Sequence, residues 1–348
     1  MSLRTHGSLQ EGEAARLGRQ REDFLDFSAN LNPFGPPASA LAAARGSDLG
    51  RYPDPACQRL RSALAEKLRV TERELLVGNG SSELLHLLAR AFVKPGDPAL
   101  VFTPAFGEYS LALDAAGARR TEVLGEAEAG FSWDLATAIR LIEAHRPGIA
   151  YLGNPNNPTG VYLSRSEVGR LAAALSPGIL VLDEAYRSFV EAPWWSLRLA
   201  PNVAIVRSLT KEYALPGLRL GYLVAARHIV ERAGGQQPSW SVSAPAQDAA
   251  IACLGEDGWL EESLALVRAA KDDLVGLLRA AGFKVQAGAA NFILVRVGDA
   301  ARTRRQLLER GIAVRDCTSF GLPQYIRVGV RTPPECQLLV GAMAEARR

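Results

Sequence analysis

The chain has few cysteines, few lysines and no long uninterrupted apolar run, and each shortage excludes a class of protein. The four cysteines among 348 residues form no C-x-x-C pair, so we expect no metal site, no disulfide framework and a reducing cytoplasm. Apolar stretches such as "GILVLDEAYRSFV" are broken by charges well short of the roughly 18 residues that a membrane helix needs. The start, "MSLRTHGSLQEGEAARLG", lacks the apolar core of a secretory signal, so we expect neither export nor a membrane partner.

The charge and the length narrow the class further. A formal net charge of +3 with 48% hydrophobic residues argues against a nucleic-acid partner. A chain of 348 residues exceeds the size at which one core usually stops growing, so a large domain with a smaller one is expected.

Strand-like and helix-like segments alternate along the chain, separated by short Gly, Pro and Asn turns. Continuous apolar runs predict buried strands in "PALVFTPAF", "GIAYLGNPNNPTG", "GILVLDEAY", "VAIVRSLTK" and "LGYLVA". Such runs are typical of a mainly parallel sheet that helices cover on both faces. We therefore predict an α/β fold, with a large domain over residues 38–240 and a small α+β domain from residues 1–37 and 241–348.

One lysine stands at the end of a predicted strand. Five of the 40 basic residues are lysine, so Lys211 in "VRSLTKEYALPGLRLGYL" invites a chemical explanation, because lysine gives up its proton far more readily than arginine. The other four are interpreted as solvated: Lys67, Lys94, Lys271 and Lys284.

Polar residues gather at the predicted strand ends, where open parallel sheets bind their ligands. An aldehyde cofactor with a pyridine ring and a phosphate would need an amine, a carboxylate for its ring nitrogen, donors for its phenolic oxygen and an anion seat. The strand ends supply an amine (Lys211), a carboxylate (Asp183), two donors (Asn157 and Tyr186), a phosphate seat (Gly80, Ser81, Ser82, Ser208 and Arg219) and a ring to stack on the pyridine (Phe106).

Each element also has an ordinary interpretation. "GNGSSE" serves equally well as a helix cap, and "GNPNNPTG" as a turn. Asp183 needs a partner if it is buried, and that partner is either an arginine or a protonated ring nitrogen. Phe106 has Tyr109 as a competitor for stacking. A nucleotide-binding protein is the alternative without an aldehyde, although neither a Walker loop nor a dinucleotide fingerprint is present.

Taken together, "NPNNPTG", "LDEAY" and "SLTKEYALPGLRLGY" resemble the pyridoxal-phosphate aminotransferase superfamily of the aspartate aminotransferase fold, from "LDFSANLNPFGPP" to "YIRVGVR". The resemblance implies pyridoxal 5'-phosphate as cofactor and a homodimer in which Tyr52 reaches the neighbouring subunit's cofactor phosphate. It also implies that Arg327 holds the substrate's α-carboxylate. A catalytically silent regulator of this superfamily would carry a fused DNA-binding segment, for which the short N-terminus leaves no room.

Within the superfamily, the sequence is similar to two families that act on small phosphorylated amino compounds. The threonine-phosphate decarboxylases of cobalamin synthesis are favoured by "THGS", "WSVSAPAQ" and "VRDCTSFGLPQYIRVGVR", and the histidinol-phosphate aminotransferases are the alternative. The resemblance implies that His6, Asn30 and Arg315 receive the substrate phosphate and that Asn157 contacts the substrate. Decarboxylation of L-threonine O-3-phosphate is therefore the expected reaction, with transamination of histidinol phosphate by glutamate as the alternative.

Overall fold

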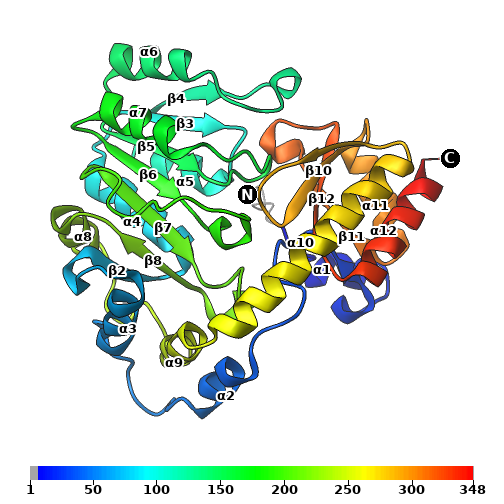
Figure 1. Cartoon of the computed structure of the whole chain (residues 1–348), viewed down its shortest axis with the longest axis horizontal. Coiled ribbons are helices and arrows are strands. Elements are labelled where there is room, and N and C mark those ends of the chain that lie inside the picture. Colours follow the sequence, from blue (N-terminus) through cyan, green and yellow to red (C-terminus); the bar gives the residue numbers. More distant parts are fainter. Residues whose placement is uncertain (1–6, 348) are drawn as a thin grey trace.

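The computed structural model describes residues 7–347, and within them the largest element is a seven-stranded sheet (Figure 1). Its order is β2 (Leu75–Asn79), β8 (Leu220–Val224), β7 (Val203–Ser208), β6 (Ile179–Asp183), β5 (Ile149–Gly153), β3 (Pro98–Thr103) and β4 (Arg119–Leu124). All neighbours pair in parallel except β8, which is antiparallel to both β2 and β7. The expected mainly parallel sheet is confirmed.

Helices cover both faces of this sheet, because alternate residues of each buried strand point to opposite sides. Val181 packs in one hydrophobic cluster, whereas its neighbours Leu180 and Leu182 pack in the other. One face carries α4 (Gly80–Phe92), α5 (Gly107–Ala115) and α8 (Arg227–Gly234). The other carries α3 (Gln58–Leu68), α6 (Leu135–His145), α7 (Arg165–Leu175) and α9 (Ala244–Leu254).

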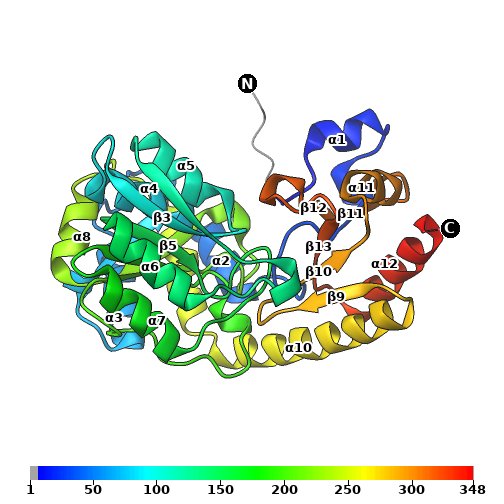
Figure 2. The ribbon, with the colours of Figure 1, turned by 90° about the horizontal axis from the view of Figure 1, so that it is seen from above.

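A second, smaller layer lies beside the large sheet (Figures 1 and 2). Its antiparallel sheet has the order β12 (Arg315–Asp316), β13 (Tyr325–Gly329), β10 (Phe292–Arg296) and β9 (Lys284–Ala287), and β1 (Leu25–Asp26) pairs in parallel with β11 (Ile312–Ala313). The helices of this part are α1 (Glu11–Arg16), α11 (Ala300–Glu309) and α12 (Pro333–Ala346). Short 3-10 helices lie at Arg21–Asp23, Glu72–Glu74, Ala127–Ala129, Arg187–Phe189, Pro216–Leu218 and Thr318–Phe320.

Helix α10 (Asp257–Ala280) runs from the large sheet to the small one along one side of the molecule (Figure 2). The preceding helix α9 packs on α2 (Ala38–Gly46) and α3, which belong to the large part. The domain boundary near residue 240 stays a prediction. Helix α9 follows that boundary in the sequence but packs on helices that precede it.

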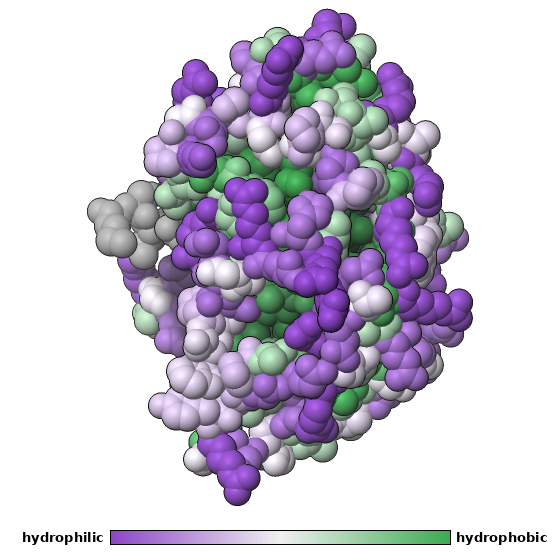
Figure 3. Space-filling model, turned by 90° about the vertical axis from the view of Figure 1, so that its left-hand side faces the viewer, coloured by the Kyte–Doolittle hydropathy of each residue, from purple (hydrophilic) through white to green (hydrophobic). Residues whose placement is uncertain are grey.

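On the face shown in Figure 3, hydrophilic and hydrophobic residues are mixed, and the hydrophobic ones lie mostly in recesses. Within residues 7–347, no helix is both long enough and apolar enough to cross a bilayer. The four cysteines are buried free thiols, and no group of three or more metal-ligating side chains occurs in this part of the chain.

Candidate active site

The carboxyl ends of β2, β3, β5, β6 and β7 meet at one edge of the large sheet, which opens into a cavity of about 1560 Å³. Residues of the small layer, among them Arg315, Ser319 and Arg327, line its other side. Most of the side chains that the sequence singled out line it: Asn30, Ser81, Ser82, Phe106, Asn157, Asp183, Tyr186, Ser208, Lys211, Arg219, Arg315 and Arg327. Functional side chains from five separate strand ends and from the small layer therefore line one cavity.

Lys211 lies three residues after the end of β7, with its side chain in the cavity. Its Nζ donates to Thr210 Oγ1 at 3.2 Å, and that hydroxyl is 2.8 Å from Ser208 Oγ. Burial, followed by the charge of Arg219, lowers the pKa of Lys211 to about 8. The amine is thus partly neutral near pH 8, which suits a nucleophile or a base. Thr210 also lines the cavity, and the sequence interpretation gave it no role in the site.

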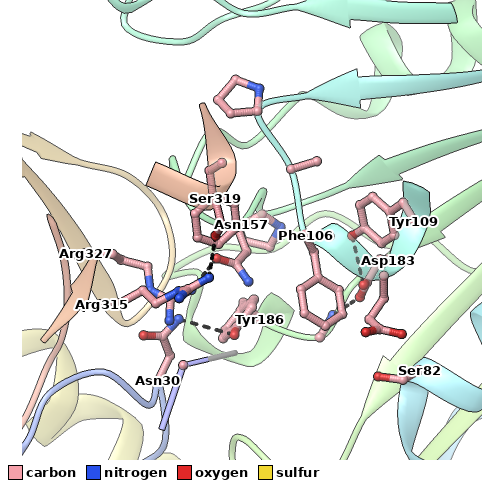
Figure 4. Close-up of a pocket in the computed structure, with 18 of the residues that line it drawn as sticks. Asn30, Ser82, Phe106, Tyr109, Asn157, Asp183, Tyr186, Arg315, Ser319 and Arg327 are labelled. Carbon is pink, nitrogen blue, oxygen red and sulfur yellow. Dashed lines mark hydrogen bonds between the residues drawn. The ribbon is translucent and has the colours of Figure 1, made fainter. Parts of the chain in front are cut away.

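Asp183 is the last residue of β6 and is 6% exposed. Its Oδ2 accepts a hydrogen bond from the Tyr109 hydroxyl at 2.9 Å, and its Oδ1 accepts one from the Ala185 N–H at 2.9 Å (Figure 4). Burial raises the pKa of Asp183, against these two bonds and the charge of Lys211. No arginine of residues 7–347 forms an ion pair with it, so the ordinary partner considered for this carboxylate is absent there.

Tyr109 is buried beneath the cavity and is the second residue that sequence reasoning missed. It was considered only as a stacking ring in place of Phe106. The two rings meet edge to face with centroids 5.9 Å apart, and Phe106 reaches the cavity whereas the hydroxyl of Tyr109 turns to Asp183 (Figure 4). The pKa of Tyr109 is raised by burial and by the carboxylate, so its hydroxyl stays protonated and donates.

The expected phosphate seat forms where β2 ends and α4 begins. Gly80 has φ +78°, and a Cβ there would lie 2.5 Å from Nη2 of Arg219. Ser81 and Ser82 line the cavity in the first turn of α4, where backbone N–H groups have no partner within the helix. A helix N-terminus, hydroxyl groups and a guanidinium therefore converge on one spot that suits a phosphate.

The opposite side of the cavity is built around Arg327 on β13, which is 4% exposed. Its Nη1 donates to Asn157 Oδ1, and its Nη2 donates to the Ser28 carbonyl at 2.8 Å. With its oxygen engaged, Asn157 has its amide NH₂ left for a ligand. Tyr186 completes this wall, and its hydroxyl accepts from Asn30 Nδ2 at 3.3 Å (Figure 4).

Arg315 joins Arg327 because β12 and β13 pair with these two residues directly opposite each other. The Arg315 guanidinium donates to Ser319 Oγ at 2.6 Å and lies over the Phe320 ring, 5.1 Å from its centroid. Burial and the charge of Arg327 lower the pKa of Arg315 to about 10. The cavity therefore holds a second cationic group, on the small layer, in addition to Arg219.

Three further expectations have different outcomes. Tyr52 is 81% exposed, stacks on Trp240 with ring centroids 4.8 Å apart, and does not line the cavity of the described chain. Its reach into a neighbouring subunit stays a prediction. His6 lies outside the described residues. The interpretation of Lys271 as solvated is wrong, because Lys271 Nζ donates to the Gly288 carbonyl and burial lowers its pKa.

Comparison with known proteins gives one consistent result. The model of the family "Aminotransferase class I and II" matches residues 22–343. The chain is 35% identical over 341 residues to histidinol-phosphate aminotransferase 1 of Thiobacillus denitrificans, covering 95% of this chain and 88% of that protein.

Solved structures show the same likeness. The histidinol-phosphate aminotransferase of Sinorhizobium meliloti in complex with pyridoxal-5'-phosphate superposes with a TM-score of 0.88 at 27% identity, over 100% of this chain and 96% of that one. Aspartate aminotransferase of Thermus thermophilus with maleate gives 0.85 at 25% identity, over 97% of both chains. These relatives are aminotransferases, so the comparisons favour the transamination alternative over decarboxylation, the main interpretation of the sequence.

Proposed function

The chain belongs to the family of class I and II aminotransferases and uses pyridoxal 5'-phosphate, and we propose that it transfers the amino group of histidinol phosphate to 2-oxoglutarate. The observation that supports this most directly is one cavity lined by Lys211, by Asp183 and by arginines from two parts of the fold, Arg219 in the large part and the pair Arg315 and Arg327 in the small layer. One group suits the cofactor phosphate and the other suits an anion on each substrate. The similarity to histidinol-phosphate aminotransferases supports histidinol phosphate as the amino donor.

The residues present fit this cofactor. Gly80 leaves room for the Arg219 guanidinium beside the α4 N-terminus, where a Cβ would collide with it, and this seat would hold the phosphate. Asp183 is a buried carboxylate that accepts hydrogen bonds from two neutral donors, the Tyr109 hydroxyl and the Ala185 N–H, so it would hold the ring nitrogen in its protonated form. Phe106 would cover the ring, and Asn157 and Tyr186 would bind its phenolic oxygen. When bound, pyridoxal phosphate supplies an electron sink for the bond that breaks at the substrate Cα.

Lys211 would first hold the cofactor and then move a proton. With its pKa lowered to about 8, roughly half of the Nζ groups are neutral at pH 8, against less than about 1% for an ordinary lysine. A neutral Nζ would accept the proton from the substrate Cα, and the resulting ammonium would give up that proton within the same half-reaction, which restores the neutral amine for the second half-reaction. Tyr109 supports this step from a distance, because its hydrogen bond favours the ionised form of Asp183.

Arg327 and Arg315 would bind the acidic groups of the two substrates. A planar guanidinium forms paired hydrogen bonds with either a carboxylate or a phosphate, so one pair of arginines serves both glutamate and the phosphorylated amine. The Asn157 and Ser28 contacts fix the plane of the Arg327 guanidinium. We expect this fixed plane to hold the substrate so that the Cα–H bond, and not a carbon–carbon bond, breaks.

The test is to incubate the purified holoenzyme with histidinol phosphate and 2-oxoglutarate, and separately with L-threonine O-3-phosphate alone. Glutamate formation in the first mixture without carbon dioxide in the second supports the proposal. If threonine phosphate releases carbon dioxide and histidinol phosphate yields no glutamate, the proposal is overturned and the decarboxylase interpretation is favoured instead. Aspartate as amino donor is the control for a less specific transaminase.

We also propose that the protein is a homodimer in which Tyr52 binds the cofactor phosphate of the neighbouring subunit. Its exposed ring, held against Trp240, supports this. Sedimentation of the holoenzyme should give twice the chain mass of 37.3 kDa. Tyr52→Phe should weaken cofactor affinity without changing that mass, and a monomer with full activity would contradict the proposal.

A further inference from the structure

Asn32 lies beside the loop that carries Lys211, and its neighbours Asn30 and Leu31 line the cavity. It is 2% exposed and belongs to the N-terminal segment, defined here as residues 28–34. The same segment bonds Arg327 through the Ser28 carbonyl and Tyr186 through the Asn30 amide. It therefore contacts the wall that Arg327 and Tyr186 form and, through Asn32, the loop that carries Lys211.

Every polar atom of the Asn32 side chain is engaged. Its Nδ2 donates to the Glu212 carbonyl at 3.0 Å and to Ser263 Oγ at 2.9 Å, and its Oδ1 accepts from the Phe34 N–H at 3.1 Å. A backbone carbonyl only accepts and a backbone N–H only donates, so these partners fix which end of the amide is which. Because the group is buried and fully bonded, it has one low-energy orientation.

The backbone of Asn32 adds a bond to the lysine itself. Its N–H donates to the Lys211 carbonyl at 2.9 Å, whereas the Ala214 N–H reaches the same carbonyl only at 3.4 Å. The loop from Leu209 to Arg219 contains no regular element except the short 3-10 helix Pro216–Leu218. Asn32 thus holds two successive carbonyls, those of Lys211 and Glu212, in a segment with little other backbone support.

Ser263 connects Asn32 to α10, and the hydrogen bonds of Asn32 to Lys211, Glu212 and Ser263 are called the clamp below. Its hydroxyl accepts from Asn32 and donates to the Leu260 carbonyl at 3.0 Å, within the same helix. Because α10 continues into the small layer, the position of the lysine loop is tied to the helix that joins the two parts.

We propose that Asn32 is a positioning residue, which fixes the Lys211–Glu212 peptide and so sets where the Lys211 amine stands in the cavity. This rests on the role proposed for Lys211. When a reacting group is displaced by about 1 Å, the rate of the reaction can fall by up to roughly a hundredfold. Loss of the clamp therefore lowers kcat, while the arginines that bind substrate keep their own contacts.

The test compares Asn32→Ala with Asn202→Ala in the holoenzyme. Asn202 is a matched control, because its Nδ2 also makes two hydrogen bonds, to the Ala172 and Gly178 carbonyls, at the amino end of β7 and away from the cavity. In Asn32→Ala we expect kcat to fall about tenfold to a hundredfold, with KM for the amino substrate within about twofold. Asn202→Ala leaves both unchanged.

A second measurement needs no substrate. The visible absorbance of the bound cofactor is recorded as a function of pH for the wild-type protein and for Asn32→Ala. The pH at the midpoint of this titration should be at least about 0.5 unit higher in Asn32→Ala. The reason is that burial and the guanidinium groups of Arg219 and Arg327 oppose a positive charge at the lysine nitrogen, with Asp183 acting in the other direction, and a looser loop admits water there. This midpoint decides the inference even if histidinol phosphate is the wrong substrate, and retention of the band in Lys211→Ala would instead overturn the proposed role of the lysine.

An Asn32→Ala protein that melts at a lower temperature with unchanged kcat and unchanged midpoint would overturn the inference, since the residue would then serve stability alone. If Asn32→Ala does not fold, Ser263→Ala decides, because it removes one bond of the same amide. A smaller upward shift of the midpoint in Ser263→Ala supports the inference, and an unchanged midpoint overturns it.

Discussion

Removal of one hydroxyl, in Tyr109→Phe, tests how the cavity keeps Asp183 ionised. The bond from this hydroxyl to Asp183 Oδ2 is 2.9 Å long and fully buried. A hydrogen bond to a charged group contributes about 1.5–3 kcal/mol, and each 1.36 kcal/mol is tenfold in an equilibrium or a rate. We therefore expect kcat to fall at least about tenfold, because the carboxylate is less readily ionised beside the ring nitrogen.

Tyr151→Phe is the matched control. This ring stacks on Tyr109 with centroids 5.5 Å apart and is equally buried, but its hydroxyl donates to the Leu85 carbonyl at 2.7 Å and not to Asp183. Loss of that hydroxyl should lower stability and leave kcat close to the wild-type value. Steady-state rates of the two variants at saturating substrate make the comparison, and equal rates would refute the role given to Tyr109.

For Tyr109→Phe we also predict how stability depends on pH. Burial already raises the pKa of Asp183 above its unfolded value, so this group costs stability as pH rises through the folded pKa. Without Tyr109 to oppose burial, the folded pKa rises further, and the cost continues to higher pH. The melting-temperature deficit of cofactor-free Tyr109→Phe should therefore grow from pH 5 to pH 9. A deficit that is the same at both pH values would contradict this.

Three further variants test other parts of the site and its support. Gly80→Ala should weaken pyridoxal-phosphate affinity at least about tenfold, because its Cβ would lie 2.5 Å from a guanidinium nitrogen of Arg219. Gly96→Ala has the same left-handed strain but no atom within 4 Å of its Cβ, so it should cost only stability. Equal affinities of the two variants in a cofactor titration would contradict this. Arg207→Ala should lower the free energy of unfolding by about 1.5–3 kcal/mol, since it removes the closer of two arginines that pair with the buried Glu184 carboxylate and leaves Arg187 at 3.7 Å. Arg227→Ala, in an exposed pair with Glu231, should cost less than about 1 kcal/mol. Denaturant unfolding makes the comparison, and similar losses would be evidence against a buried ion pair. Arg327→Lys should raise KM for glutamate at least about tenfold, because an ammonium cannot reproduce the forked contacts; an unchanged KM in steady-state assays would remove this residue from substrate binding.

Local signals in the sequence were sufficient for the sheet and for most of the cofactor site. Continuous apolar runs that end in a polar residue gave β6 with Asp183 and β7 with Ser208, and parallel strands must bring such ends together. The glycine before a helical pattern gave the turn at Gly80, which takes φ +78° as that turn requires.

Residues whose roles depend on packing between distant segments were missed. Phe106 and Tyr109 follow the same strand, and only the folded arrangement brings the Tyr109 hydroxyl to Asp183, 74 residues away. Likewise Lys271 has an ordinary helical pattern, and its carbonyl partner comes from the turn before β10. Arg315 and Arg327 become neighbours only through the register of β12 and β13, which no local signal specifies.

The most direct test of the account is to reduce the holoenzyme with borohydride, digest it and locate the cofactor by mass spectrometry. The account predicts a yellow protein that bleaches on reduction and a single pyridoxyl-phosphate adduct on Lys211, absent in Lys211→Ala. A colourless protein after incubation with the cofactor, or an adduct on any other lysine, would contradict it.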